Sequence, residues 1–407
     1  MYKRDSLADE KDVALLVENN GGLLRLKPTW VPRALGVPGA RMGLRRDEVN
    51  THAYGPIVER WIASTVAASG SSRPDDGLSY IVDDVGKRMV RLRDVVNMGG
   101  STIIGKETYT AYNDWPVLGK ILDYYVPIPF HLHHREEHAR LVGKRPKPEA
   151  YYYPPELNED PGTFPYLFIG LSPDTEPTDL RACLERWDKG DNGVLDLSQA
   201  YRQRPGTGWL VPAGVLHAPG SMVTFEIQMA SDIGAIYQSM RNDGFLIPID
   251  YLFSDFPPDR KGDLDFALEL IDWRENLDPR FKENHYIEPL FLEDPNITAK
   301  EGYTVKAVIY GHELFGVKEL RLRPKAEIML RDRQPFVIFT VRGYGELEGR
   351  PLESIDHSSL EDLSYDEYFV VDWKARDGVK IVNRSPSKEL VLIVYGPKGL
   401  IISKRER

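Results

Sequence analysis

The sequence predicts a mainly β fold made of two sandwiches or barrels, with a small helical insertion. Short apolar runs recur at near-regular spacing, and many of the 34 glycines and 30 prolines lie between them. These runs form two groups, separated by a proline-rich break around 289–295. A chain of 407 residues is too long for one ordinary core and predicts two to three domains.

The first group of predicted strands begins near Trp115. Residues 116–134 hold two apolar runs, and further runs lie at 166–171 and 208–230. The first hundred residues show no comparable pattern. A turn-rich stretch at 21–46 could turn its arginines toward an anionic ligand, but isolated arginines usually cover solvated surface, which is what we expect for Arg25, Arg33, Arg41, Arg45 and Arg46.

Two helices are predicted from apolar residues at helical spacing. Leu180, Cys183, Leu184 and Trp187 share one face, in a helix that we expect to start at Asp174 or Thr175, before Pro177, and to stop at Gly190. A second helix is predicted over 263–273. Cys183 is the only cysteine, which excludes an intramolecular disulfide and a multi-cysteine zinc site. We expect it to be a small buried residue rather than a reactive thiol.

The second group of predicted strands lies at 318–324, 336–349, 368–373, 379–384 and 389–396. We therefore predict an N-terminal domain over 1–255 with the helical insertion near 174–205, a helical and proline-rich connection over 256–295, and a C-terminal β domain over 296–407.

Charge and hydropathy exclude several classes of partner. The net charge of −10 does not favour nucleic acid, and no apolar run reaches the roughly 18 residues of a membrane span. The first twenty residues contain acids and no long apolar stretch, so we expect no signal peptide and a cytoplasmic protein. Composition leaves the oligomeric state open.

A histidine cluster is the clearest candidate site. If residues 131–133 form a strand, His131 and His133 point to the same face, because side chains alternate along a strand. A third histidine, His217, follows the turn 211–214 at the start of another strand. Glu149 or Glu137 could add a carboxylate. Three imidazoles and one carboxylate suit Zn²⁺, Fe²⁺, Mn²⁺, Ni²⁺ or Co²⁺, with a position left for substrate.

The other histidines are assigned less central roles. His134 would face away from the pair and His138 is offset from it, so we expect both beside the site or at the surface. The remaining four show no local pattern and are interpreted as structural: His52, His285, His312 and His357.

Several segments together resemble the cupin superfamily, and within it the class I phosphomannose isomerases. The similar segments follow one another over roughly residues 55–240, at 59–72, 118–134, 147–149, 211–220 and 225–232. This resemblance implies a bicupin of two jelly-roll β-barrels, with helices inserted near 178–189 and metal bound only in the first barrel.

The resemblance also implies roles for individual residues. The metal ligands would be His131, where the family has Gln, together with His133, Glu149 and His217; the match of Lys-Pro-Glu favours Glu149 over Glu137. The implied active-site residues are Lys120, Lys147, Glu226 and Asp232.

The implied activity is a metal-dependent aldose–ketose isomerisation of the mannose 6-phosphate/fructose 6-phosphate type, on a small-molecule sugar or sugar phosphate. It proceeds through an enediolate and needs a base, for which Glu226, Asp232 and a lysine are candidates. Burial near a metal would lower the pKa of Lys120 or Lys147. A phosphate could be bound by Arg135, Arg202 or Arg204.

One departure from the family keeps other functions open. Where the family carries an arginine that acts on substrate, this chain has Ile236, and the next arginine is Arg241. The alternatives are a non-catalytic sugar-binding or regulatory cupin, and another cupin metalloenzyme such as a dioxygenase. The lysine and carboxylate quartet favours an isomerase over an oxygenase.

Overall fold

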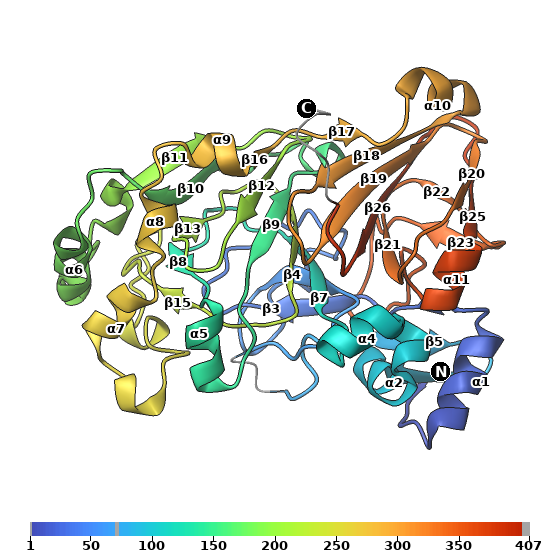
Figure 1. Ribbon diagram of the computed structural model, residues 1–407, viewed down its shortest axis with the longest axis horizontal. Coiled ribbons are helices and arrows are strands. Elements are labelled where there is room, and N and C mark those ends of the chain that lie inside the picture. Colours follow the sequence, from blue (N-terminus) through green and yellow to red (C-terminus); the bar gives the residue numbers. More distant parts are fainter. Residues whose placement is uncertain (1, 70–72, 401–407) are drawn as a thin grey trace.

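The structure is a computed structural model that describes residues 2–69 and 73–400. It consists mainly of antiparallel sheets, with helices gathered at its two ends (Figure 1). The predicted mainly β class is therefore confirmed. The last residues of the serine-rich turn in 59–72, residues 70–72, lie outside the described part of the chain.

Two seven-stranded antiparallel sheets form the middle of the molecule. The strands of the first sheet, in spatial order, are β16 (Tyr286–Ile287), β12 (Gly208–Val211), β9 (Glu149–Tyr152), β14 (Thr224–Met229), β7 (Val117–Leu122), β4 (Ile57–Ile62) and β3 (Thr29–Pro32). Those of the second sheet are β17 (Leu290–Phe291), β18 (Tyr303–Ile309), β19 (Gly316–Leu322), β26 (Leu390–Gly396), β21 (Phe336–Arg342), β24 (Glu367–Val370) and β2 (Leu23–Arg25).

Three smaller sheets complete the strands. The five-stranded sheet contains β11 (Ser198–Arg202), β10 (Tyr166–Leu171), β13 (His217–Ala218), β8 (His131–Leu132) and β15 (Ala235–Ile236). The four-stranded sheet contains β20 (Glu327–Leu330), β25 (Val379–Asn383), β22 (Tyr344–Leu347) and β23 (Arg350–Glu353), and the three-stranded sheet contains β1 (Lys3–Arg4), β6 (Arg88–Arg91) and β5 (Tyr80–Asp83). Each sheet has two edge strands, so the described residues form open sheets and no closed barrel.

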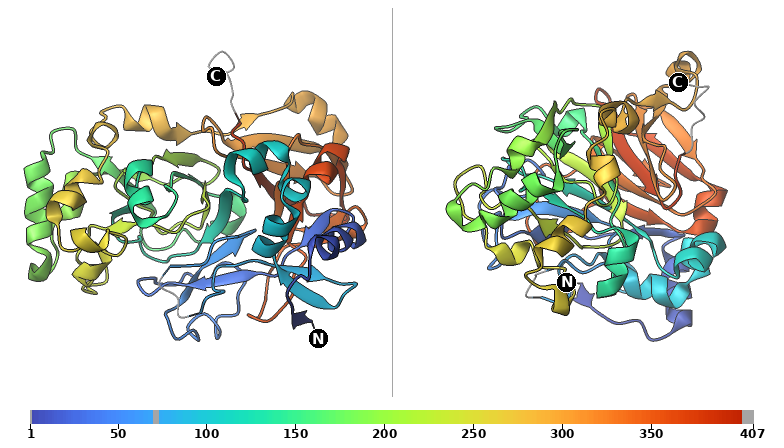
Figure 2. Two further views of the ribbon diagram at one scale, coloured as in Figure 1. Left: turned by 60° about the horizontal axis from the view of Figure 1, so that its bottom comes forward. Right: turned by 60° about the vertical axis from the view of Figure 1, so that its left-hand side comes forward.

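The sheets pack as two sandwiches placed against each other. Leu167 of the five-stranded sheet shares a core with Trp209 of the first seven-stranded sheet. Leu347 of the four-stranded sheet shares another core with residues of the second seven-stranded sheet. The two large sheets meet in the central core, which joins Phe225 to Ile393. Figure 2 shows these layers from two further directions.

The helices are short. Their bounds are α1 (Glu10–Asn19), α2 (Leu92–Gly99), α3 (Ser101–Ile104), α4 (Lys106–Tyr112), α5 (Glu136–Ala139), α6 (Pro177–Glu185), α7 (Leu264–Glu269), α8 (Trp273–Asn276), α9 (Phe281–His285), α10 (Pro295–Glu301) and α11 (Asp372–Asp377). The 3₁₀ turns cover Arg140–Val142, Pro155–Leu157, Trp187–Lys189, Val194–Leu197, Ile249–Tyr251 and Pro258–Arg260. No helix among the described residues combines the length and the apolar character that a bilayer span requires.

The helix predicted around Leu180 is present as α6. It starts after Glu176 rather than after Asp174 or Thr175, because the carboxylate of Asp179 accepts the Glu176 backbone N–H at 2.9 Å and closes a capping box there. Cys183 is buried on the apolar face of this helix, as expected.

The second predicted helix, over 263–273, is too long. The structure has α7, which ends at Glu269, and a separate α8, whose N-cap is Asp272. The Asp272 side chain accepts the Glu275 N–H at 3.1 Å, and such a local bond favours a new helix start over continuation.

The first hundred residues contribute to both halves of the molecule. Strand β2 pairs with β24 at the edge of the second large sheet, whereas β3 and β4 belong to the first large sheet. Strand β16, from the predicted connection, pairs with β12. The domain boundaries at 255 and 295 stay a prediction.

Candidate metal centre and its cavity

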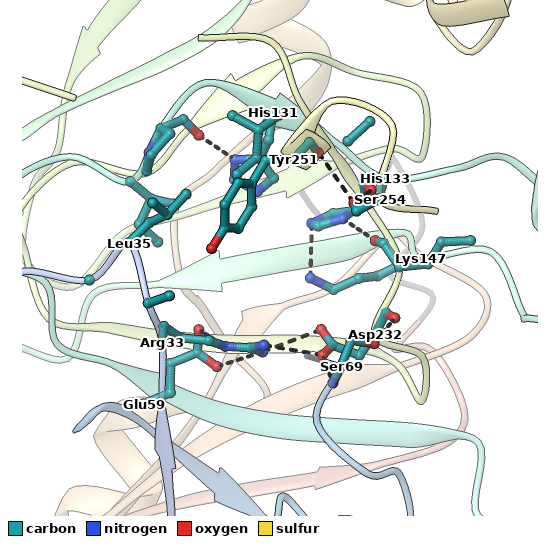
Figure 3. A pocket seen from close by; sticks show the side chains of 18 of the residues that line it. Arg33, Leu35, Glu59, Ser69, His131, His133, Lys147, Asp232, Tyr251 and Ser254 are labelled. Carbon is teal, nitrogen blue, oxygen red and sulfur yellow. Dashed lines mark hydrogen bonds and ion pairs between the residues drawn. The ribbon is translucent and has the colours of Figure 1, made fainter. Parts of the chain in front are cut away.

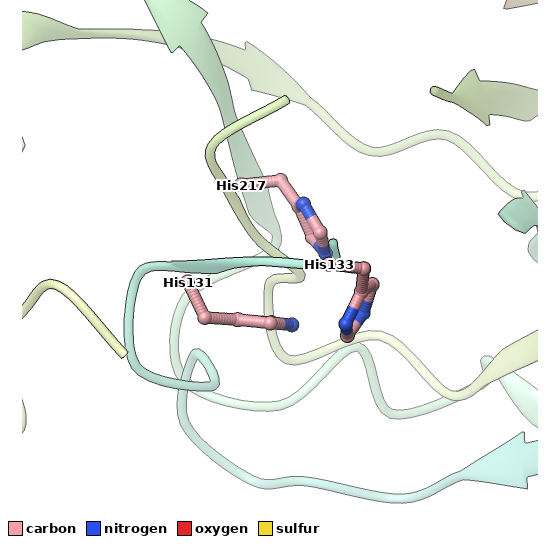
Figure 4. Close-up of side chains that lie close together, drawn as sticks. All are labelled: His131, His133 and His217. Atoms are coloured by element: carbon pink, nitrogen blue, oxygen red, sulfur yellow. The ribbon is translucent and has the colours of Figure 1, made fainter. Parts of the chain in front are cut away.

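Strand pairing brings the three predicted histidines together. His131 lies directly opposite His217 where β8 pairs with β13, and their ring centroids are 4.2 Å apart. His133 follows β8 by one residue, and its ring lies 5.0 Å from that of His131, as the alternation along a strand predicts. Figure 4 shows the three rings converging on one point.

Backbone carbonyls fix the protonation of all three rings. Each Nδ1 lies within 2.8 Å of a carbonyl oxygen, that of Pro129, Ile233 or Val215. Because a carbonyl only accepts, each Nδ1 carries the ring proton and the lone pair of a neutral ring remains on Nε2. This arrangement prepares imidazoles for metal binding.

Burial keeps the rings of His131 and His133 neutral. It lowers the pKa of His131 well below its usual value, with help from the neighbouring His217 and His133. Burial, followed by the charge of Lys147, lowers the pKa of His133 to about 4. Neutral imidazole is the form that binds a metal ion.

Glu149 lies against two of the histidines. Its carboxylate oxygens are 3.1 Å from Nε2 of His133 and 3.1 Å from Nε2 of His217. Burial alone would raise the pKa of Glu149, but the charge of Lys147 holds it well below the usual range. The group is therefore a carboxylate, and the hydroxyl of Tyr151 donates a hydrogen bond to it.

The donor set fits a divalent cation. The histidine ligand atoms lie within 4.8 Å of one another, so His131, His133 and His217 could hold a metal ion. Nε2 of His217 and Oε2 of Glu149 are buried without a hydrogen bond. A tetrahedral ion with bonds of about 2.1 Å holds its ligand atoms about 3.4 Å apart, which is close to the two 3.1 Å contacts of Glu149 with His133 and His217.

Glu137, His134 and His138 lie outside this cluster. Glu137 is 57% exposed and pairs with Arg135 at 3.0 Å. The ring of His134 is buried against Phe256, and burial lowers its pKa to about 3. His138 contacts the carboxylate of Glu269 at 3.8 Å.

A cavity of about 690 Å³ opens beside the histidines. Three buried charged side chains form a row along its wall, which begins next to Glu149. Lys147 Nζ lies 2.9 Å from Glu149 Oε2 and 3.7 Å from Glu226 Oε1, and Lys120 Nζ lies 3.3 Å from the same Glu226 oxygen.

The alternation of side chains along β7 and β14 places Lys120 and Glu226 on one face, and Lys147 lies two residues before β9. In β14, Phe225 and Ile227 point into the central core, so Glu226 between them points toward the cavity. Lys120 of β7 is the register partner of Glu226. In sequence, Lys120 and Glu226 each interrupt a strand that is otherwise uncharged.

Asp232 lies on the same wall, bound to Arg33 (Figure 3). The Arg33 guanidinium donates to both oxygens of Asp232 at 3.2 and 3.3 Å and to both oxygens of Glu59 at 3.0 and 3.1 Å. The expectation that Arg33 covers solvated surface is therefore wrong. It is also wrong for Arg25 and Arg41, which are largely buried against Asp84 and Asp123, whereas Arg45 and Arg46 are exposed.

The carboxyl groups of the wall differ in their proton affinity. Burial and the nearby Glu149 raise the pKa of Glu226, although Lys120 and Lys147 oppose this shift. Burial would also raise the pKa of Asp232, but the charge of Arg33 outweighs it and the pKa falls far below the usual value.

The pKa of Lys147 is raised, so the predicted fall is wrong for this lysine. Burial does favour the neutral amine, but the charges of Glu149, Glu226 and Asp232 outweigh it. Lys147 is thus a fixed cation.

None of the arginines proposed for phosphate lines this cavity. Arg135 is paired with Glu137, and Arg202 and Arg204 are exposed elsewhere. Ile236 does line it, because β15 pairs Ile236 with His131. Arg241 binds Asp243 at 2.6 Å instead.

The sequence interpretation missed several polar residues of the wall, among them Glu59, Lys144 and Tyr151. Glu59 had a recognisable signal, since it is an acid inside the apolar strand β4, all of whose residues are buried. Lys144 and Tyr151 lie close to Lys147 and Glu149 in sequence, which is a weaker indication.

Comparison with known proteins places the fold. No model of a known protein family matches the sequence, and no curated protein matches it significantly. Among solved structures, the mannose 6-phosphate isomerase from Bacillus subtilis is similar with a TM-score of 0.61 and 18% identity, over 92% of this chain and 99% of that one. A phosphomannose isomerase variant from Salmonella typhimurium is similar with a TM-score of 0.60 and 13% identity, over 93% and 100% of the two chains.

A further similar structure is a mannose 6-phosphate isomerase bound with zinc and yttrium, with a TM-score of 0.58 and 13% identity, over 92% of this chain and 100% of that one. The chain thus has the fold of the phosphomannose isomerases along almost its whole length, which confirms the resemblance at the level of the fold. At these identities the residues of the site must support any functional proposal themselves.

Proposed function

We propose that this protein is a metal-dependent aldose–ketose isomerase that acts on a sugar or sugar phosphate of the mannose 6-phosphate/fructose 6-phosphate type. The observation that carries the proposal is the position of Glu226. This buried carboxyl group has a raised pKa and lies in the same cavity wall as the histidine cluster. A base beside a metal centre is what proton transfer between adjacent carbons requires.

We further propose that His131, His133, Glu149 and His217 are the ligands, that Zn²⁺ is the ion, and that the protein works in the cytoplasm. The two sandwiches would be the two cupin units, of which only the first carries these ligands. When bound, the ion supplies a Lewis acid for the carbonyl and hydroxyl oxygens of the sugar.

Glu226 is the best base among the candidates. Asp232 is held as a weak base by Arg33, and Lys147 stays protonated among its carboxylates. Glu226 would take the proton from the carbon next to the carbonyl and return it to the former carbonyl carbon, while a proton moves between the two oxygens. Once Glu226 has taken this proton it is neutral, so the ammonium groups of Lys120 and Lys147 on either side of it would be released to stabilise the enediolate.

The proposal is tested by elemental analysis of the purified protein together with turnover of an aldose and ketose panel. The panel is run after loading with Zn²⁺, Mn²⁺, Co²⁺, Fe²⁺ or Ni²⁺. Interconversion that is lost on chelation and restored by metal supports the proposal. A complete lack of turnover with every ion contradicts it.

A non-catalytic sugar-binding protein is the second candidate, because an apolar side chain, Ile236, lies beside His131 in the cavity. It predicts thermal stabilisation by a sugar without product. Oxygen uptake with Fe²⁺ would instead reveal a dioxygenase.

A further inference from the structure

We infer that the cavity takes an unphosphorylated, neutral sugar rather than a sugar phosphate. The inference rests on the proposed function and specifies its substrate class. It follows from the state of the cationic side chains that line the cavity, which are Arg33, Lys120, Lys144 and Lys147.

Each of these cations already has a carboxylate partner. Arg33 donates hydrogen bonds to Glu59 and Asp232 from all three nitrogens of its guanidinium group. Lys144 Nζ lies 2.5 Å from Asp255 Oδ1 and also donates to the Asp232 carbonyl at 2.9 Å.

The two remaining lysines are engaged in the same way. Lys147 contacts Glu149 at 2.9 Å, and Lys120 contacts Glu226 at 3.3 Å. All four residues of these two pairs are buried, with side-chain exposure of at most 5%. A phosphate that bound Lys120 or Lys147 would therefore have to displace a carboxylate from a buried ion pair, and that carboxylate would be left buried without an opposite charge.

Carboxyl groups slightly outnumber cationic groups among the side chains of the wall, before the charge of the proposed metal ion is added. Among the residues that the structure describes, five carboxyl groups line the cavity against the four cations, and they are Glu59, Glu226, Asp232, Asp250 and Asp255. Recognition of a phosphate dianion uses unpaired guanidinium or ammonium groups, or free backbone N–H donors. The N–H of Gly234, which lines the cavity, already donates to Asp255 at 2.9 Å.

Much of the rest of the wall is apolar or aromatic. Leu35, Ile128, Ile236 and Tyr251 line it near His131, and Figure 3 shows Tyr251 and Leu35 on that side of the cavity. Such a surface suits the carbon face of a neutral sugar ring, whose hydroxyls can exchange hydrogen bonds with the charged pairs without breaking them.

The test compares mannose and fructose with mannose 6-phosphate and fructose 6-phosphate as substrates of the metal-loaded full chain. We expect kcat/KM to favour the neutral sugars by about 100-fold or more, the size of effect that like-charge contacts produce. A preference for the phosphorylated pair overturns the inference and leaves the isomerase proposal standing.

If neither the free sugars nor the sugar phosphates are turned over, the proposed function fails. The inference about the substrate class is then tested separately, by measuring which sugar binds. Calorimetric titration of the metal-loaded protein with mannose and with mannose 6-phosphate then supports it if mannose binds more tightly. Tighter binding of the phosphate, or binding of neither sugar, overturns it.

A variant that removes one charge tests whether the paired cations cause the preference for a neutral sugar. Asp255→Asn removes the partner of Lys144 with little change in shape, and we expect it to shift the preference toward the phosphorylated substrate by about tenfold. Asp243→Asn is the matched control, since it removes an equal charge from Arg241 outside the cavity. An unchanged preference in Asp255→Asn, or an equal shift in both variants, contradicts the explanation.

Discussion

His217 presents the lone pair of its Nε2 to Glu149 at 3.1 Å, because its Nδ1 proton is already donated to the Val215 carbonyl. Two acceptors face each other here in a fully buried position. This contact becomes favourable when a cation lies between them, so the pair is better explained by metal binding than by packing.

Replacement of His217 should therefore remove the metal. We expect His217→Ala to lower metal affinity by more than about 100-fold, because loss of a ligand costs more than loss of a residue that only orients one. Metal content per chain after dialysis is the measurement. The exposed His357 provides the control, and His357→Ala should keep its metal. Full metal content in His217→Ala would refute the site.

Glu149, rather than Glu137, should act as the carboxylate ligand. Glu149→Gln keeps the shape but removes the charge, and we expect metal affinity to fall by about 10–100-fold or more. Glu137→Gln is the matched comparison, because its side chain is largely exposed and paired with Arg135. The assignment is wrong if Glu137→Gln loses metal and Glu149→Gln keeps it, as measured by competition with a chelating dye.

Loss of the base should abolish turnover without loss of metal. We expect Glu226→Gln to lower kcat by about 10²–10⁴-fold with unchanged metal content. In the unmodified protein, kcat/KM should rise with pH as Glu226 loses its proton, at a pH above the ordinary pKa of a glutamate. If Glu226→Gln keeps rapid turnover and Asp232→Asn loses turnover, the catalytic base is Asp232 and not Glu226.

A second buried acid should limit stability at neutral pH. Glu367 on β24 accepts the Ala63 N–H at 2.8 Å and contacts Arg60 at 3.2 Å. Burial raises its pKa from 4.5 to about 7, against the opposing charge of Arg60. Its folded form thus holds a proton more tightly than the unfolded form, so this group destabilises the fold increasingly as pH rises from 4.5 through 7.

Glu367→Gln resembles the protonated form and removes this pH dependence. At pH near 8 we expect its free energy of unfolding to exceed that of the unmodified protein by up to about 3 kcal/mol, and the gain should vanish toward pH 4.5. Urea unfolding at both pH values measures it. Glu361→Gln is the control: its side chain is 89% exposed, so the free energy of unfolding should change little at either pH. A destabilised Glu367→Gln at pH 8 would show that Arg60 needs the charge.

The histidines of the site were predictable because local rules fix them. A spacing of two on a strand places His131 and His133 on one face, and the turn before His217 starts a new strand. What the sequence does not contain is the pairing of β8 with β13, which alone brings these segments together.

Other features depended on contacts between distant segments. Arg33 has the sequence context of a surface arginine, and only the approach of Glu59 and Asp232 draws it into the cavity. The same holds for the raised pKa of Lys147, which depends on three carboxylates from other positions. The apolar spacing predicted strands correctly in the C-terminal half, but spacing does not tell an open sheet from a closed barrel.

The pairing of β2 with β24 links folding to the direction of synthesis. Residues 23–25 leave the ribosome long before residues 368–370 exist, yet they form the edge of the same sheet. During translation β2 has no partner strand, and one edge of β24 stays unpaired until β2 docks against it. Assembly of this sheet should therefore be among the slow, chaperone-sensitive steps in maturation of the protein.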